Sequence, residues 1–364
     1  MSNTTEKSPI ILLAHSKIIA FEWGKILIDI FQRQTAKKKI PLHVIYRWQD
    51  VKNTQAPVIV VGVDSEWLQE VFTHLDHLKL HAISLNGKWE NEDAISHISA
   101  DQQALVRQCI SLLRTSNRTQ TAFFGVQKND TSDHLKALAF EKFFDKEDVY
   151  FVDESVEIAC GKLLKNVDKY DSVICANDVM AIYLLKRCRA LNIQIPEKLF
   201  LIGNGNLWLS EHVTPSLTTI TYNPEAMVDL TLYVQRILEK FPASKPIQAH
   251  LNGSIVERES TSATTQSVQV RTEYAHYTMD SPSQFPCPEL AQICNLDRIL
   301  SLASKEKYEI LKLVFNGVSY SEIAKKIFLS EDTVHYHIKK VYKQLNIHSK
   351  NEFIDMLNAY GIVL

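Results

Sequence analysis

The sequence lacks the patterns of a membrane or exported protein. Its longest apolar runs, such as APVIVVGV at 56–63, have strand length, whereas a helix needs about 20 apolar residues to span a bilayer. The first residues, MSNTTEKSP, are polar and carry no signal-peptide pattern. The six cysteines form no CxxC pair, so the usual zinc and redox motifs are missing. These absences predict a cytoplasmic protein with reduced thiols and no membrane partner.

The common catalytic motifs are missing as well. Only 10 of 364 residues are glycine, and they form neither a GxGxxG nor a P-loop pattern. The 13 histidines show no metal-ligand spacing, and no Ser-His-Asp ordering appears. We therefore expect no catalysis, no metal and no cofactor. The length and the 45% apolar content indicate a globular chain of two or three domains.

What is present over residues 9–258 is an alternation of apolar runs with amphipathic segments. Runs of strand length are PIILLA, PVIVVGV, HAISL, TAFFGV, VYFV, SVICA and LFLIG, and helical patterns separate most of them. Strands separated by helices of about 10–15 residues are typical of parallel sheets with both faces covered. There are too many strands for one small sheet. The pattern therefore predicts an α/β fold of two doubly wound lobes.

The last 60 residues have a different pattern, that of short capped helices. Ser304 and Ser330 stand at expected helix starts, Ser319-x-x-Glu322 forms a capping box, and Gly317 and Gly361 stand at helix ends. Apolar residues recur at helical spacing and would close one small core. Residues 301–364 carry nine lysines and seven carboxylates. This weak positive charge is compatible with a polyanionic partner.

The third helix of this unit, from Ser330 to Gln344, combines an apolar face with a basic outer face. A second helix of a helix-turn-helix enters the major groove in this way. A solvated amphipathic helix would show the same spacing. On the DNA-binding hypothesis, the candidate contact residues are Ser330, Thr333, Val334, His335, His337, Lys339, Lys340 and Lys343.

The motif order in GVSYSEIAKKIFLSEDTVHYHIKKVYKQLNIHSKNE closely resembles the four-helix DNA-binding domain of the LuxR/NarL regulators. The resemblance covers about 60 residues, and it implies that Ser330 to Gln344 is the recognition helix. Two positions depart from that family. His335 stands where a lysine is usual, and Lys307 stands where a glutamate is usual.

Polar residues follow the apolar runs of the first 260 residues. In open α/β sheets ligands bind outside the carboxyl ends of the strands, so two lobes that face each other would collect these residues around one cleft. The alternative for each residue is helix capping, as expected of Asp178 before VMAIYLLKRCRAL. The candidate ligand-binding residues are His15, Ser16, Asp64, Trp89, Lys136, Asn177, Asn204 and Asn206.

Residues 172–262 resemble the sugar-sensing core of the lactose/purine repressor family, through SVICANDVM, VTPSLTTITYNPEAM and IVERESTS. The resemblance implies a periplasmic-binding-protein-like fold and a ligand contact at Asn177. One lobe would hold about 9–117 and 221–244, the other about 118–220 and 245–258. A ligand-binding aspartate of that family is replaced by the Asn204–Asn206 segment, and an arginine by Lys136. With both replaced, the usual ligand of that family is not expected. The loops carry Asn177, Asn204 and Asn206 and no dense arginine cluster, which favours a small neutral effector, most simply a sugar.

These observations predict a sensor (1–262), a linker (263–302) and a DNA-binding domain (303–364). The predicted function is a transcription regulator that binds DNA as a homodimer and responds to a small molecule. Contact with RNA polymerase is an additional expectation. Two alternatives remain: a phosphorylation-controlled response regulator, with Asp64 as acceptor, and a sensor whose helical tail binds protein. The first is disfavoured because His15 and Ser16 follow the first strand in place of an acidic pair.

Overall fold

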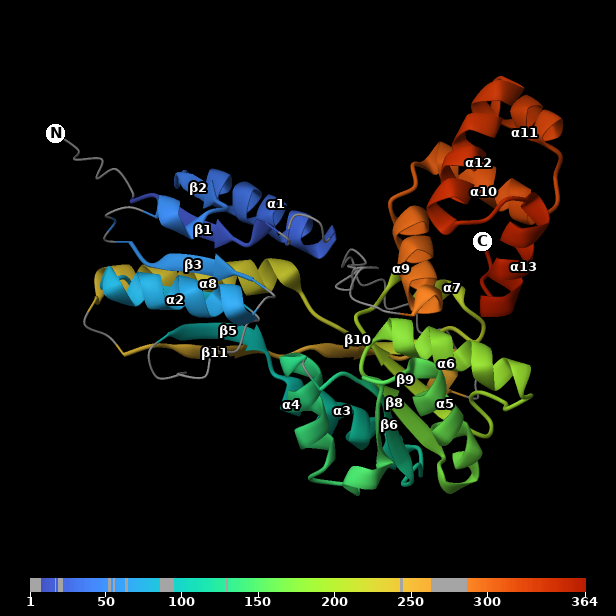
Figure 1. The fold of residues 1–364 in the computed structure, drawn as a ribbon, viewed down its shortest axis with the longest axis horizontal. Coiled ribbons are helices and arrows are strands. Elements are labelled where there is room, and N and C mark those ends of the chain that lie inside the picture. Colours follow the sequence, from blue (N-terminus) through green and yellow to red (C-terminus); the bar gives the residue numbers. More distant parts are fainter. Residues whose placement is uncertain are drawn as a thin grey trace. The chain divides into compact units, whose positions relative to one another are not determined.

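The computed structural model describes residues 8–364 except 17, 19–21, 52–53, 55, 63–64, 86–94, 129, 243–244 and 263–286. The chain divides into two compact units, each assembled from separate stretches of sequence (Figure 1). One unit holds residues 1–104 and 222–253, and the other holds 105–221 and 254–364. We call the α/β part of the first unit lobe one, and residues 105–221 with 254–262 lobe two.

Lobe one contains a six-stranded sheet with the order β11-β5-β4-β3-β1-β2, in which every pairing is parallel. Alternate residues of β1 lie in different cores. Ile10, Leu12 and Ala14 pack with α1 and α8, whereas Ile11 and Leu13 pack with α2. Both faces of the sheet are therefore covered, as the apolar runs predicted. The elements are β1 (Ile10–Ala14), α1 (Glu22–Lys37), β2 (Leu42–Ile45), β3 (Val58–Val61), α2 (Ser65–His77), β4 (Ala82–Leu85), β5 (Ser96–Ala100), α8 (Pro224–Lys240) and β11 (Gln248–Leu251).

Lobe two contains a second six-stranded sheet, with the order β12-β10-β9-β8-β6-β7. Its pairings are parallel except between β10 and β12, which are antiparallel. The two-lobed fold with parallel sheets is thus confirmed. The elements are α3 (Gln102–Thr115), which starts at the unit boundary, β6 (Thr121–Val126), α4 (Thr131–Phe140), β7 (Val149–Phe151), α5 (Val156–Lys165), β8 (Ser172–Cys175), α6 (Asp178–Ala190), β9 (Phe200–Asn204), α7 (Trp208–His212), β10 (Thr218–Thr221) and β12 (Ser254–Val256).

Four capped helices form the carboxyl-terminal domain, which we call the reader. Each predicted serine cap accepts a backbone N–H bond, and Ser319 with Glu322 forms the complete capping box. The predicted ends at Gly317 and Gly361 have φ of +81° and +65°, where a residue without Cβ avoids strain. The helices are α10 (Lys305–Phe315), α11 (Tyr320–Ile327), α12 (Glu331–Leu345) and α13 (Lys350–Tyr360).

The structure differs from the predicted boundaries in three places. Strand β11 pairs with β5, so residues 248–251 belong to the sheet of lobe one and not to lobe two. Most of α3 belongs to the second unit. The segment expected to be a linker contains a further helix, α9 (Pro288–Ser301), whose apolar residues are buried. Residues 263–286 lie outside the described part of the chain.

Candidate functional sites

The outer face of α12 is the first candidate site. Val334, Ile338 and Val341 point into the core, each at most 1% exposed, and fix the orientation of the helix. The opposite side carries exposed lysines and partly exposed histidines. The lysines are Lys339, Lys340 and Lys343, and the histidines are His335 and His337. Exposed cations along one helix face can neutralise phosphates.

A tight turn sets the angle between α11 and α12. Phe328 ends α11 with φ of +59°, in the left-handed region, and Ser330 begins the cap of the next helix two residues later. The Ser330 Oγ accepts from the Thr333 amide at 3.1 Å and lies 2.7 Å from the Thr333 hydroxyl. Two capped helices joined by such a turn are the geometry of a helix-turn-helix.

Three predicted DNA contacts have other roles in the structure. Val334 is 0% exposed, so its inclusion was wrong, because the residue completes the apolar face of α12. Thr333 and Ser330 form the cap described above. Lys307, which departs from the LuxR/NarL pattern, lies near Lys340, and burial together with this second cation lowers the pKa of Lys307.

The second candidate site is the carboxyl edge of the sheet in lobe two, where β6, β8 and β9 end. Asn177 follows β8 and caps α6, since its Oδ1 accepts from the Met180 amide at 2.9 Å. The cap leaves the Nδ2 group of Asn177 to donate to a ligand. Asp178 was expected to be the cap, and this was wrong. Its side chain is 0% exposed and binds groups of the following loop and strand.

A buried ion pair lies at the same edge. Lys136 Nζ donates to Asp133 Oδ1 at 2.9 Å and to the Ala176 carbonyl at 2.7 Å. Both charged side chains are 8% exposed, and burial raises the pKa of Asp133 against the opposing effect of Lys136. Asn204 Nδ2 lies 3.5 Å from the same Ala176 carbonyl, and the buried Asn204 Oδ1 has no hydrogen-bond partner among the described residues. The Ala176 carbonyl therefore brings Lys136 and Asn204 together.

Asn206, two residues further along, is held by a residue that the sequence analysis missed. Arg258 donates to Asn206 Oδ1 at 2.8 Å, to the Leu217 carbonyl at 2.8 Å and to Glu211 at 3.3 Å. Burial lowers the pKa of Arg258. Arg258 belongs to the segment IVERESTS, which was used only to mark the end of the core. Asp133, the partner of Lys136, was missed too, because no local pattern links it to a ligand.

The remaining predicted ligand residues lie in lobe one. His15, at the end of β1, is 7% exposed and stacks on Trp67 with ring centroids 4.6 Å apart. Ser16 is exposed. Asp64 and Trp89 lie outside the described residues. In lobe two, Trp208 stacks on His212 with ring centroids 3.4 Å apart.

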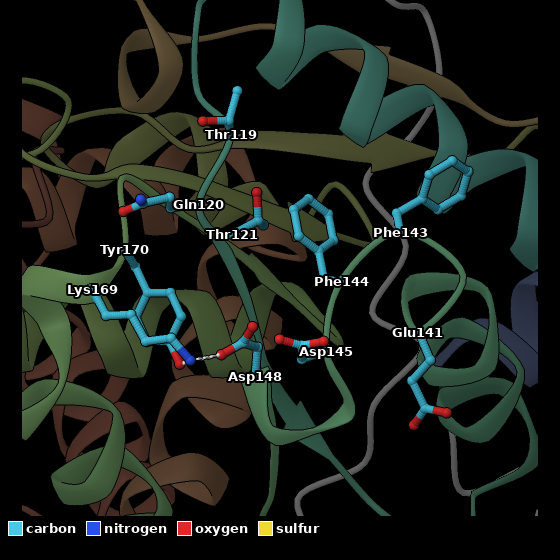
Figure 2. Close-up of a pocket in the computed structure, with 10 residues that line it drawn as sticks. All are labelled: Thr119, Gln120, Thr121, Glu141, Phe143, Phe144, Asp145, Asp148, Lys169 and Tyr170. Carbon is cyan, nitrogen blue, oxygen red and sulfur yellow. Dashed lines mark hydrogen bonds and ion pairs between the residues drawn. The ribbon is translucent and has the colours of Figure 1, made fainter.

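Two pockets of lobe two lie elsewhere. Figure 2 shows the larger, of about 410 Å³, at the amino ends of β6, β7 and β8. Its Asp148 carboxylate accepts from Lys169 at 2.6 Å and from Tyr170 at 2.8 Å, so the charge is compensated. A second pocket, of about 310 Å³, lies beside β7 and α5. Neither contains a predicted ligand-binding residue.

Two regions of the chain, each containing one of the candidate sites, match known domain families. Residues 110–261 match the periplasmic binding protein-like domain, and residues 300–357 match the bacterial regulatory proteins of the luxR family. The chain therefore joins a periplasmic-binding-protein-like domain to a LuxR-type helix-turn-helix domain. Both resemblances drawn from the sequence motifs are confirmed. Among the described helices, none is long and apolar enough to cross a membrane.

Curated proteins with similar sequences include two transcription regulators. The HTH-type transcriptional repressor PurR of Vibrio atlanticus is 30% identical over 110 residues, 29% of this chain and 32% of the relative. The xylose operon regulatory protein of Haemophilus influenzae is 25% identical over 187 residues, 47% of each chain. The chain thus spans about a third to a half of the length of these relatives.

Solved structures agree on the fold. The transcriptional regulator CelR in complex with cellobiose has a TM-score of 0.56 at 15% identity, covering 70% of this chain and 84% of that one. The lac repressor dimer bound to operator and an anti-inducer has a TM-score of 0.55 at 14% identity, covering 71% and 83%. At this identity the likeness concerns the fold alone.

Proposed function

We propose that the protein is a transcription regulator that binds DNA through α12 and responds to a small molecule bound at the carboxyl ends of the sheet strands. The proposal rests on the exposed basic face of α12. The opposite face of this helix is buried in the core of the reader, which fixes its orientation. The DNA-contacting residues are Lys339, Lys340 and Lys343, assisted by His335 and His337. Ser330 and Thr333 fix the start of the helix.

We propose a neutral, hydroxylated effector of the sugar class. The only charged predicted ligand residue in the described part of lobe two is Lys136, and Asp133 already compensates its charge. Uncharged amides, Asn177, Asn204 and Asn206, then remain to bind hydroxyl groups. The similarity to CelR, which binds cellobiose in its complex, and to the xylose operon regulatory protein supports this class. His15 and Ser16 of lobe one stay predictions from the sequence.

The resemblance of residues 172–262 to the lactose/purine repressor family favours a second effector class, purines. The discriminating experiment is a thermal-shift screen of the purified protein against sugars and purines. A rise in Tm with a sugar supports the proposed class, because a ligand that binds only the folded state stabilises it. A rise with purines alone would assign the second class. No rise with either would contradict both.

Asn177 offers a sharp test of the effector site, because its two side-chain groups have separate roles. In Asn177→Asp the cap oxygen is retained while the Nδ2 donor is lost. We expect the affinity for the screened ligand to fall by about 1–3 kcal/mol, because a ligand acceptor is left unpaired. Titration calorimetry measures the affinity, and urea unfolding verifies the cap. Unchanged affinity would remove Asn177 from the site.

We further propose that the protein acts as a homodimer. One reader offers a small interface with one half-site, and two copies on one duplex reach useful affinity. Sedimentation at micromolar concentration is expected to show a dimer with and without effector.

The affinity for DNA should shift severalfold when effector binds, and the affinity for effector should shift by the same factor when DNA binds. If the DNA titrations superimpose, the signal passes through another contact, such as RNA polymerase.

A further inference from the structure

Helix α9 belongs to neither matched domain except at its end. The sensor match ends at residue 261 and the reader match begins at 300, whereas α9 spans Pro288–Ser301. It is nevertheless deeply buried. Its large aliphatic residues and Cys294 are at most 4% exposed, and they are Leu290, Ile293, Cys294, Leu296, Ile299 and Leu300.

Helix α9 is covered by residues of lobe two and by residues of the reader. The helix contacts α6 and α7 of lobe two and α12 of the reader (Figure 1). Its apolar residues join one continuous core with Val179 and Tyr183 of α6 and with Leu345 and Tyr360 of the reader. Since a continuous apolar core is the mark of one folding unit, the reader and lobe two form a single body.

Polar contacts fix this arrangement at the start of α9. Glu289 accepts from Lys186 at 2.7 Å and from Arg187 at 2.5 Å, and both cations lie on α6. The Glu289 side chain is 19% exposed. Cys287 Sγ lies 3.1 Å from Glu157 Oε1, which extends the contact to α5. These partners orient α9 along lobe two.

A second set of contacts involves the carboxyl-terminal residues. The Val363 amide donates to the His212 carbonyl at 2.8 Å, and the Thr214 amide donates to the Gly361 carbonyl at 2.9 Å. Val213 and Ile362 form an antiparallel bridge. Arg189 donates to the Ala359 carbonyl at 3.1 Å and also to the Thr214 carbonyl. The end of the reader is thus hydrogen-bonded to the segment that follows α7.

Helix α7 itself is held from both sides by buried carboxylates. Asp178 accepts from the Leu207 amide at 2.8 Å and from the Ser210 hydroxyl at 2.7 Å. Asp297 of α9, 1% exposed, accepts from the Leu209 amide at 2.9 Å. On the reader side, Trp208 packs edge-on against Tyr308 with centroids 5.9 Å apart. α7 begins two residues after Asn206.

We propose that α9 docks the reader permanently on lobe two, and that α7 transmits effector binding at Asn204 and Asn206 to the reader. Asp297 is the positioning residue of this link, because it connects the backbone of α7 to α9. The docking stands on the contacts alone, whereas transmission rests on the proposed effector site. A displacement of α7 has to be followed by α9 or has to break the buried Asp297–Leu209 bond.

The docking is tested by a cleavage experiment on the full chain. A specific protease site is inserted after residue 274, and the cut protein is passed over a size-exclusion column. The two fragments are expected to elute together, because the contacts above do not depend on the peptide link. Separation of the wild-type fragments under native conditions would overturn the docking. This readout is independent of any DNA or effector binding.

The transmission is tested by hydrogen exchange of the uncut protein with random-sequence duplex DNA as the probe. DNA bound to the reader is expected to slow amide exchange in α7 and in residues 204–206 of the wild type. In Asp297→Leu the effect on α7 should disappear, and the Leu209 amide should exchange about tenfold faster. Glu289→Gln, which keeps Asp297, should retain the effect on α7.

Two outcomes would overturn the transmission. The first is equal exchange of wild-type α7 with and without DNA, and the second is a wild-type response in Asp297→Leu. The same titration reports whether DNA binds at all, so a failure of the proposed function is recognised separately. Circular dichroism and urea unfolding establish that Asp297→Leu is folded, and Asp297→Asn, which keeps an acceptor oxygen, serves as a milder second variant.

Discussion

Replacing Lys339 and Lys343 with alanine is expected to weaken binding to every DNA sequence by about 10- to 100-fold at about 0.1 M salt. Both side chains are exposed on the outer face of α12. A lysine that neutralises a phosphate releases a condensed counterion, so the slope of log K against log salt should fall by about 0.9 for each contact. Fluorescence anisotropy titrations at several salt concentrations measure both quantities.

The matched control replaces Lys162 and Lys165, two exposed lysines of α5 in lobe two. This variant loses the same net charge without touching α12, so its salt slope should stay that of the wild type. If the α12 variant keeps the wild-type affinity and slope, the two lysines are only solvated. A helical tail that binds protein would then become the better hypothesis.

Elements with strong local signals were predictable from the sequence. The apolar runs were all found as strands, because a parallel strand covered on both faces consists mainly of apolar residues. The serine caps of the reader were predictable for a similar reason. The side chains of Ser319 and Glu322 accept hydrogen bonds from each other's backbone N–H groups within four residues. The start of this helix therefore does not depend on a distant contact.

Short strands at the edges of the sheets had no such signal. The strand β11 reads QAHL, with alternate residues exposed, and it pairs with β5 from about 150 residues earlier. Polar residues on a half-exposed edge resemble a loop in sequence. The partner of β11 depends on long-range topology, so its assignment to lobe one could not be read from local pattern.

Helix α9 shows how composition can mislead. The prolines before it suggested a linker, but Pro288 occupies the first helical turn, where its missing N–H costs nothing. Leu290, Ile293, Leu296 and Leu300 follow at helical spacing. The periodicity was available in the sequence, whereas the surface that covers it was not.

The buried acids were the least predictable part of the site. The sequence analysis assigned the cap of α6 to Asp178, one residue after the actual cap, Asn177. The end of β8 determines which of the two residues starts the helix. Asp133 and Asp297 have no signal at all in the sequence. Their partners are a buried lysine and a backbone amide that only the folded chain brings near.

Replacing Asp178 with alanine is expected to lower the free energy of unfolding by about 3–5 kcal/mol. The carboxylate accepts from the Leu207 amide at 2.8 Å, the Ser210 hydroxyl at 2.7 Å and the Thr219 hydroxyl at 2.6 Å. All of these donors would be left without their acceptor inside the protein, and each such loss costs about 1–3 kcal/mol. Urea unfolding followed by tryptophan fluorescence measures the change.

Asp168→Ala is the matched control. Its carboxylate is 94% exposed and is paired with Lys198 at 3.1 Å, so we expect a change within about 0.5 kcal/mol. Gly203→Ala tests the packing around the Asp178 carboxylate, because a Cβ at residue 203 would stand 2.0 Å from Asp178 Oδ1. Its loss of stability should therefore be large in the wild type and smaller in the Asp178→Ala background, where that oxygen is absent. Additive losses would mean that the glycine is required by its other neighbour, Leu217, and that Asp178 does not organise this part of lobe two.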